Sequence, residues 1–117
     1  MRVLNYIRGE FVDPESDFWM DNFSPSSGEV IGSIPLSGER DVDNAVMSAV
    51  EALPHWSSLR PLERAEWLER IADCLESKFE EIARLESLDT GKPISLSRSV
   101  DAKRSVSNFR FFSGMIR

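Results

Sequence analysis

The sequence predicts an α+β fold in which two small β-hairpins are followed by three or four α-helices. Up to residue 36, short apolar and aromatic runs alternate with turn residues such as Gly9, Pro25 and Gly28, a pattern typical of paired strands. From residue 37 onward, apolar residues recur every three or four positions, which is the period of amphipathic helices. We therefore assign residues 1–36 to the hairpins and residues 37–117 to a helical part.

Each hairpin has a turn of suitable chemistry. In the first, Tyr6-Ile7 and Phe11-Val12 flank the turn at residues 8–10. In the second, residues 18–23 and 30–35 are the strands. The turn between them contains a proline that presets φ and a glycine that permits a positive φ.

Four helical stretches follow. The first carries an apolar stripe of Val42, Ala45, Val46, Ala49, Val50 and Leu53, and we expect Pro54 to end it. The second begins at Pro61, and its stripe is Ala65, Leu68, Ile71, Ala72 and Leu75. Residues 77–80 have the form of a capping box, which predicts a break near Ser77. The third helix stops at residues 89–93, with Gly91 as a left-handed cap.

The last helix is expected over residues 94–117. Its inward residues would be Val100, Val106, Phe109, Phe112 and Ile116. Three phenylalanines stand within residues 109–112, and on a helix they cannot all face one side. At least one of them must lie exposed or find a partner elsewhere.

Composition and charge exclude several classes of protein. With 117 residues, of which 41% are hydrophobic and 29% charged, the chain is one soluble domain or part of one. A net charge of −6 argues against nucleic-acid and anionic-membrane partners, because binding phosphates needs clustered Lys and Arg. The single cysteine, Cys74, fits a reducing compartment. Without a bilayer-spanning run or a signal-peptide core, we expect a cytoplasmic protein.

A collinear set of phrases resembles the amino-terminal quarter of an aldehyde dehydrogenase. The two clearest are Ser-Pro-Ser-Ser-Gly-Glu-Val at residues 24–30 and Leu-Asp-Thr-Gly-Lys-Pro at residues 88–93. Further matches lie at residues 5–12, 41–46, 56, 63–65 and 71–73. Ser24 stands where the family usually has Asn. The resemblance covers essentially the whole chain. It implies that the segment belongs to an α/β architecture with a Rossmann-like cofactor domain, residues 37–117 being the helical part of that domain.

A narrower resemblance is to the aminomuconic and hydroxymuconic semialdehyde dehydrogenase branch. It rests on residues 89–93, on Val-Asp-Ala-Lys-Arg at 100–104 and on Asn-Phe-Arg-Phe-Phe at 108–112. The branch typically reads Asp-Ile-Pro-Arg before Asn-Phe, whereas Ala102-Lys103 replaces Ile-Pro here.

The family resemblance implies a reaction whose chemical groups are not in this stretch. In the family, a cysteine thiolate attacks the aldehyde, NAD or NADP takes a hydride, and a glutamate serves as base for hydrolysis of the thioester. These groups and the Gly-rich cofactor loop lie downstream of the matched region, and no Gly-x-Gly-x-x-Gly occurs here. We therefore assign no catalytic or cofactor-binding residue and expect the stretch alone to be inactive. A homodimer or homotetramer is expected for the complete enzyme.

Two sites are implied by the resemblance, each with an ordinary alternative. Arg104 matches an arginine that grips a substrate carboxylate; alternatively it is exposed or paired with Asp101. Asp89 and the backbone carbonyls of Asn22 and Phe23 match the place of a structural monovalent cation. Alternatively, Asp89 merely precedes the end of its helix.

The remaining polar residues have simpler interpretations. Cys74 lies in a helical pattern without a neighbouring histidine and is a small helical residue rather than a nucleophile. His55 is interpreted as a surface loop residue, and no zinc-ligand spacing occurs. The acidic residues of 63–81 form a solvated face, some of them pairing with Arg64, Arg70 or Lys78.

A second hypothesis comes from another class of function. The chain would then be a non-catalytic helical module that binds a protein through residues 109–112.

Overall fold

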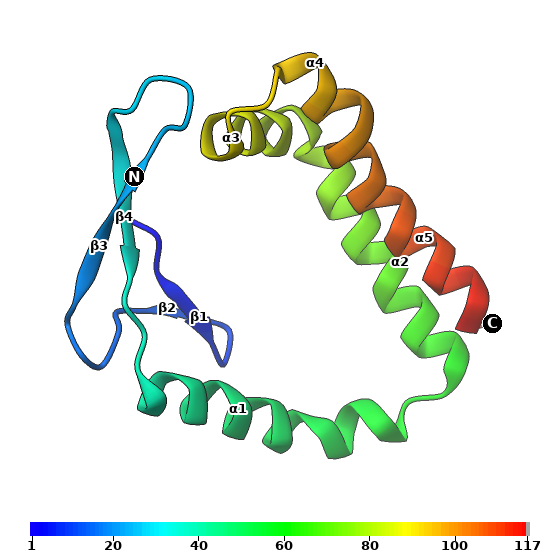
Figure 1. Cartoon of the computed structure of the whole chain (residues 1–117). Coiled ribbons are helices and arrows are strands. Elements are labelled where there is room, and N and C mark those ends of the chain that lie inside the picture. The colour runs from blue at the N-terminus through cyan, green and yellow to red at the C-terminus, as the bar shows by residue number, and fades with distance from the viewer. Residues whose placement is uncertain (117) are drawn as a thin grey trace. The chain divides into compact units, whose positions relative to one another are not determined.

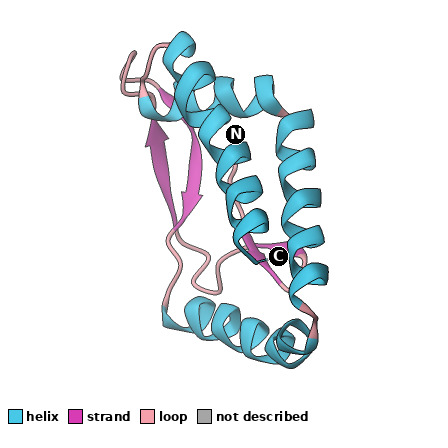
Figure 2. Ribbon diagram, turned by 90° about the vertical axis from the view of Figure 1, so that its right-hand side faces the viewer, coloured by secondary structure: helices cyan, strands magenta, loops and turns pink. Residues whose placement is uncertain are grey.

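The computed structural model describes residues 1–116. They form two compact units, Met1–Ser57 and Ser58–Arg117. Each unit is described by itself below. The first holds the strands and most of one helix, and the second holds the remaining helices (Figures 1 and 2).

The first hairpin joins β1 (Asn5–Ile7) to β2 (Glu10–Val12). Tyr6 is paired with Phe11 across the antiparallel ladder, and their ring centroids lie 5.0 Å apart. Arg8 and Gly9 have φ values of 56° and 81°. Two positive φ values match the twist of a tight hairpin turn. The predicted hairpin is thus confirmed.

The second hairpin joins β3 (Trp19–Phe23) to β4 (Val30–Pro35), also as predicted. Its turn is closed by a hydrogen bond of 2.8 Å from the Gly28 amide to the Ser24 carbonyl, with Gly28 at φ 73°. The register shifts between Asn22 and Phe23, which marks a bulge in β3. Residues 1–3 run along β4, and the Ser33 amide donates to the Met1 carbonyl at 2.9 Å.

Helix α1 (Glu39–Ser58) differs from its prediction in two respects. Pro54 lies inside the helix rather than at its end, because a proline removes a single amide donor and the turn after it continues, with Ser57 Oγ donating to the Pro54 carbonyl at 3.2 Å. The predicted apolar stripe is exposed, because two short hairpins are too small to cover a 20-residue helix. The buried residue of α1 is Asp41.

The second unit begins with α2 (Pro61–Ser77) and α3 (Phe79–Thr90). The predicted start at Pro61 and the break beside Ser77 are confirmed, but the capping box there is wrong. Ser77 Oγ donates to the Cys74 carbonyl at 2.7 Å and caps nothing in α3. Gly91, at φ 74°, ends α3 as predicted.

The last helical run consists of α4 (Ile94–Leu96), η1 (Ser97–Ala102) and α5 (Lys103–Ile116). The expected helix is present, but it contains an unpredicted π-helical turn, η1. Residue 117 of the prediction lies outside the described residues.

α5 lies beside α2 in both views (Figures 1 and 2), and small residues fill their interface. Ala65 and Ala72 of α2, Ala102 of η1 and Ser113 of α5 are all buried. Small side chains let the two helices approach closely. Phe111 and Phe112 are exposed and Phe109 is half-buried. The expectation that the phenylalanines cannot all be covered is therefore confirmed, whereas the inward position predicted for Phe112 is wrong.

Candidate functional site

Arg104 lies near the start of α5 in an open hollow of about 350 Å³. The hollow is lined by Ser99, Val100, Lys103, Arg104, Ser107 and Asn108. Each of these residues lies three or four positions from another member of the set, so they share one face of the run from η1 into α5. The face that packs on α2 carries Val106 and Ser113, both buried, and Arg104 lies on the exposed side.

The Arg104 guanidinium has no ion-pair partner among residues 1–116. Asp101, the alternative partner considered from the sequence, binds Lys92 instead, with Asp101 Oδ2 3.0 Å from Lys92 Nζ. An exposed and unpaired guanidinium can donate two parallel hydrogen bonds to a carboxylate. Lys103, beside it in the hollow, adds a second positive charge.

A bridging lysine ties the segment before Arg104 to α3. Lys92 Nζ lies 3.1 Å from Glu86 Oε1 of α3 and 3.0 Å from Asp101 Oδ2 of η1. The hydrogen bond to Asp101, followed by that to Glu86, raises the pKa of Lys92. Arg98 of η1 adds a second tie, since its Nε lies 3.1 and 3.0 Å from the two carboxylate oxygens of Glu80.

The residues predicted to hold a cation are each described within their own unit. Asn22 and Phe23 lie at the bulged end of β3 in the first unit, and Asp89 lies in the last turn of α3 in the second. Among residues 1–116, no group of three or more His, Cys, Asp or Glu side chains is arranged to hold a metal ion. That finding does not concern backbone carbonyls, and the site stays a prediction.

The other polar residues singled out in the sequence lie in helices α1, α2 and α3 or directly after α2. Cys74 is exposed on α2, and His55 lies in the last turn of α1 rather than in a loop. Lys78 pairs with Glu81 at 4.0 Å, so the expectation that some of the acidic residues pair with Arg64, Arg70 or Lys78 is confirmed. Arg64 donates to the Leu59 carbonyl, and Arg70 lies over the ring of Trp67.

The acidic residues on α2 bind an arginine from α5 instead. Arg110 Nη2 lies 2.6 Å from Glu76 Oε2 and 3.1 Å from Asp73 Oδ1. The bond to Glu76, followed by that to Asp73, raises the pKa of Arg110. The acidic face is therefore partly a contact between helices. Helical spacing within one segment cannot reveal such a pair.

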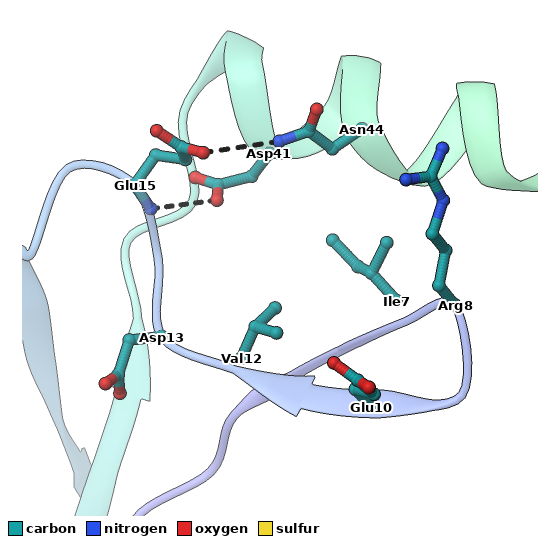
Figure 3. A pocket seen from close by; sticks show the side chains of 8 residues that line it. All are labelled: Ile7, Arg8, Glu10, Val12, Asp13, Glu15, Asp41 and Asn44. Atoms are coloured by element: carbon teal, nitrogen blue, oxygen red, sulfur yellow. Dashed lines mark hydrogen bonds between the residues drawn. The ribbon is translucent and has the colours of Figure 1, made fainter.

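A second hollow, of about 290 Å³, lies in the first unit. Figure 3 shows the side chains that line it. The buried carboxylate of Asp41 accepts the Glu15 amide at 2.9 Å and the Gly38 amide at 2.8 Å. It thus fastens the loop after β2 to the start of α1, a role that sequence reasoning missed. The spacing of Gly38 and Asp41, which is that of an N-cap and the third helical residue, is the signal that could have found it.

The described residues form no cradle for a dinucleotide. Such a cradle is a Gly-rich turn between a strand and a helix. The glycines with positive φ are Gly9, Gly28 and Gly91, and they lie in two hairpin turns and a helix end. In addition, among residues 1–116 no helix combines the length and apolar character needed to cross a membrane.

Comparison with known proteins places these features in a family. The model of the aldehyde dehydrogenase family matches residues 11–117. The 2-aminomuconic semialdehyde dehydrogenase of Bos taurus is 46% identical over 116 residues, covering 99% of this chain and 23% of the bovine protein. The 2-hydroxymuconic semialdehyde dehydrogenase of Pseudomonas sp. (strain CF600) is 36% identical, covering 98% of this chain and 24% of that protein.

Among solved structures, the crystal structure of PnpE in complex with nicotinamide adenine dinucleotide superposes with a TM-score of 0.94 at 43% identity. The match covers 98% of this chain and 24% of PnpE. The chain therefore spans about a quarter of the length of the relatives that it matches. The family and the semialdehyde dehydrogenase branch suggested by the sequence are both confirmed. This chain belongs to the aldehyde dehydrogenase family.

Proposed function

We propose that this chain acts as the amino-terminal part of an NAD(P)-dependent aldehyde dehydrogenase that oxidises a carboxylated semialdehyde of the muconic type. The overall reaction converts an aldehyde and water into a carboxylate, with the hydride passing to NAD(P) and a cysteine thioester as intermediate. The observation that carries the substrate class is the exposed, unpaired guanidinium of Arg104 in its hollow. The similarity to two muconic semialdehyde dehydrogenases supports it.

Arg104 would bind the substrate's carboxylate, at the end remote from the aldehyde. A bidentate arginine contact fixes the orientation of a planar carboxylate as well as attracting it. This contact holds the substrate before and during reaction alike, so its loss raises KM more than it lowers kcat.

The remaining groups of the proposed enzyme would lie outside this chain. The described residues do not fit NAD, because they contain no Gly-rich turn between a strand and a helix. We propose that residues 1–36 form the hairpins of the enzyme and that residues 37–117 form the helical part of its cofactor domain. The complete enzyme would be a cytoplasmic homodimer or homotetramer without nucleic-acid or membrane partners. The 117-residue chain by itself should be inactive. Reduction of NAD by the purified chain in the presence of an aldehyde would disprove this.

The experiment that tests the substrate class compares two aldehydes in the proposed complete dehydrogenase. The probes are 6-oxohexanoate, which carries a carboxylate, and hexanal, which does not. Arg104→Met should raise KM for 6-oxohexanoate on the order of 10- to 100-fold, because it removes charge-assisted hydrogen bonds. The KM for hexanal should stay unchanged.

The matched control is Arg84→Met, which removes an exposed arginine from α3, away from the hollow. It should leave both KM values at the wild-type level. Equal behaviour of the two aldehydes in Arg104→Met would refute carboxylate recognition by Arg104.

We further propose that the carbonyls of Asn22 and Phe23, with Asp89, hold a structural monovalent cation in the complete enzyme. The match of residues 11–117 to the aldehyde dehydrogenase family supports this, because the resemblance implies such a cation at the matching residues. Replacing potassium by choline should lower the Tm of the wild-type enzyme but not that of Asp89→Asn. An equal response of the two proteins would disprove the site.

A protein-interaction module is the second candidate function. The observation in its favour is the exposure of Phe111 and Phe112, which are 61% and 57% accessible. The intact mass of the untagged protein from its source cell separates the two functions. A mass several times 13.3 kDa supports the dehydrogenase, and a mass near 13.3 kDa supports the module.

A further inference from the structure

The substrate arginine proposed above follows directly on an unusual turn. The π-turn η1 ends at Ala102, two residues before Arg104. A π-turn holds one residue more than an α-helical turn. Compared with a regular α-helix of the same number of residues, it therefore rotates the direction of every later side chain by about 100°. The orientation of Arg104 relative to α3 therefore depends on η1 remaining in place.

Lys92 bridges η1 and α3 close to Arg104, in addition to the direct pair between Arg98 of η1 and Glu80 of α3. Its ammonium group lies between Glu86 and Asp101, at 3.1 and 3.0 Å, so one cation links two carboxylates from two elements. The three side chains are 28–37% exposed, which leaves this contact less open to solvent than an ordinary surface pair. Asp101 stands three residues before Arg104, about one helical turn away.

The backbone of Lys92 is held as well. Ser87 Oγ of α3 donates to the Lys92 carbonyl at 2.6 Å, next to the left-handed cap at Gly91. Because the main chain of Lys92 is fixed on the end of α3, only its side chain has to be ordered for the ammonium group to reach Asp101 of η1. The ammonium group can therefore help to fix the position of η1.

We propose that Lys92 is a positioning residue for Arg104: by binding Asp101 and Glu86 it holds η1 against α3 and so sets the direction of the Arg104 guanidinium. This inference rests on the proposed function of Arg104. It goes further in assigning carboxylate specificity to a residue that touches no substrate. Removing the charge of Lys92 weakens binding of carboxylated aldehydes and leaves binding of uncharged ones unchanged.

The test uses the same two aldehydes in the complete dehydrogenase. Lys92→Met should raise KM for 6-oxohexanoate on the order of tenfold, because a small displacement of a binding group has a large effect on a bidentate contact. Both KM for hexanal and kcat for either aldehyde should stay at the wild-type level. Lys92→Arg, which keeps the charge, should restore most of the loss.

The matched control is Lys78→Met, which removes an exposed lysine directly before α3 whose partner Glu81 lies in the first turn of that helix. It should change neither KM. Asp101→Asn serves as a second variant should Lys92→Met fail to fold, and it should raise KM for 6-oxohexanoate alone. Equal losses with both aldehydes, in whichever of the two variants folds, would show a purely structural role and overturn the inference.

A double variant separates this inference from the function on which it rests. In the background of Arg104→Met, Lys92→Met should add nothing, because its effect passes through Arg104. A further rise in KM there would overturn the positioning role. If Arg104→Met raises KM for 6-oxohexanoate and Lys92→Met does not, the positioning role fails and the proposed function stands. If Arg104→Met has no effect, both fail.

Discussion

Ser113 Oγ donates a hydrogen bond of 3.1 Å to the main-chain carbonyl of Ala65, and both residues are fully buried. This bond joins α5 to α2 across residues that are 48 positions apart. It also shows how closely the helices approach, because a serine side chain reaches the backbone of the neighbouring helix. The contact fixes the helical face that carries Arg104 on the side away from α2.

Substitutions at Ser113 should therefore distinguish the contribution of the hydrogen bond to stability from that of the close packing. Ser113→Ala keeps the volume and loses the bond, which should lower the free energy of unfolding by about 1 kcal/mol. Ser113→Leu forces the helices apart and should cost up to about 3 kcal/mol. Urea denaturation would measure both. A leucine variant as stable as the alanine variant would contradict the packing argument.

Substitution of Asp41 should lower the stability of the protein more than substitution of its neighbours on α1. Asp41→Ala leaves the amides of Glu15 and Gly38 without their acceptor, at an expected cost of about 2 kcal/mol. Asp43→Ala, two residues along on the exposed surface, should change stability by less than about 0.5 kcal/mol. Similar Tm values for the two variants would disprove the stabilising role of the hydrogen bonds from the Glu15 and Gly38 amides to Asp41.

Gly32 should not tolerate a side chain. A Cβ there would lie 1.9 Å from the Met1 carbonyl oxygen, which no ordinary contact allows. Gly32→Ala should therefore detach residues 1–3 from β4, and amide hydrogen exchange should accelerate at Val3 and Ser33.

The control for this change is Gly114→Ala, because nothing lies within 4 Å of a Cβ at Gly114 and the residue is helical. It should raise stability by about 0.5–1 kcal/mol. Unchanged exchange at Val3 in Gly32→Ala would refute the close approach.

The start of α2 should depend on pH through Glu63. Its carboxylate accepts the Arg60 amide at 2.7 Å and pairs with the Arg60 guanidinium at 3.0 Å. The side-chain bond from Arg60, followed by the backbone bond, lowers the pKa of Glu63 below its ordinary value. A lowered pKa means that the stabilisation is complete above the ordinary pKa of glutamate, about 4.3, and is lost as pH falls through the folded value.

The variant Glu63→Gln tests this sign. The difference in Tm between wild type and variant should be present at pH 7 and should shrink steadily below about pH 4. A difference that grows on acidification would show that the carboxylate does not provide the contact.

The hairpins and helix boundaries could be predicted from the sequence because their causes are local. Gly28 and Gly91 adopt the positive φ values that the pattern requires, and Pro61 occupies the first position of α2. Pro54 misled the prediction, since a single missing donor does not always end a helix. Ser77 misled it as well, because its hydroxyl satisfies a carbonyl behind it instead of an amide ahead.

The site was less accessible to sequence reasoning. The family resemblance identifies Arg104, but it does not predict the residues that surround its side chain. The contact between Lys92 and Asp101 spans nine positions and a π-turn, and no periodic pattern encodes either. The bond from Arg110 to Glu76 spans 34 positions and depends on how two helices pack. Such contacts arise from tertiary structure, which helical spacing within one segment does not report.

The π-turn also matters at the level of the gene. Because η1 contains an extra residue, losing one codon from the stretch that encodes residues 97–102 could be absorbed by an ordinary α-helix without breaking the run. The two ends of the run would then keep about the same relative orientation, because an α-helix with one residue fewer rotates through about the same total angle as the run with its π-turn. Circular dichroism would hardly register the change, and the preference for acidic over neutral aldehydes should be retained. At this position the chain can therefore lose a single residue in the course of evolution and keep its substrate range.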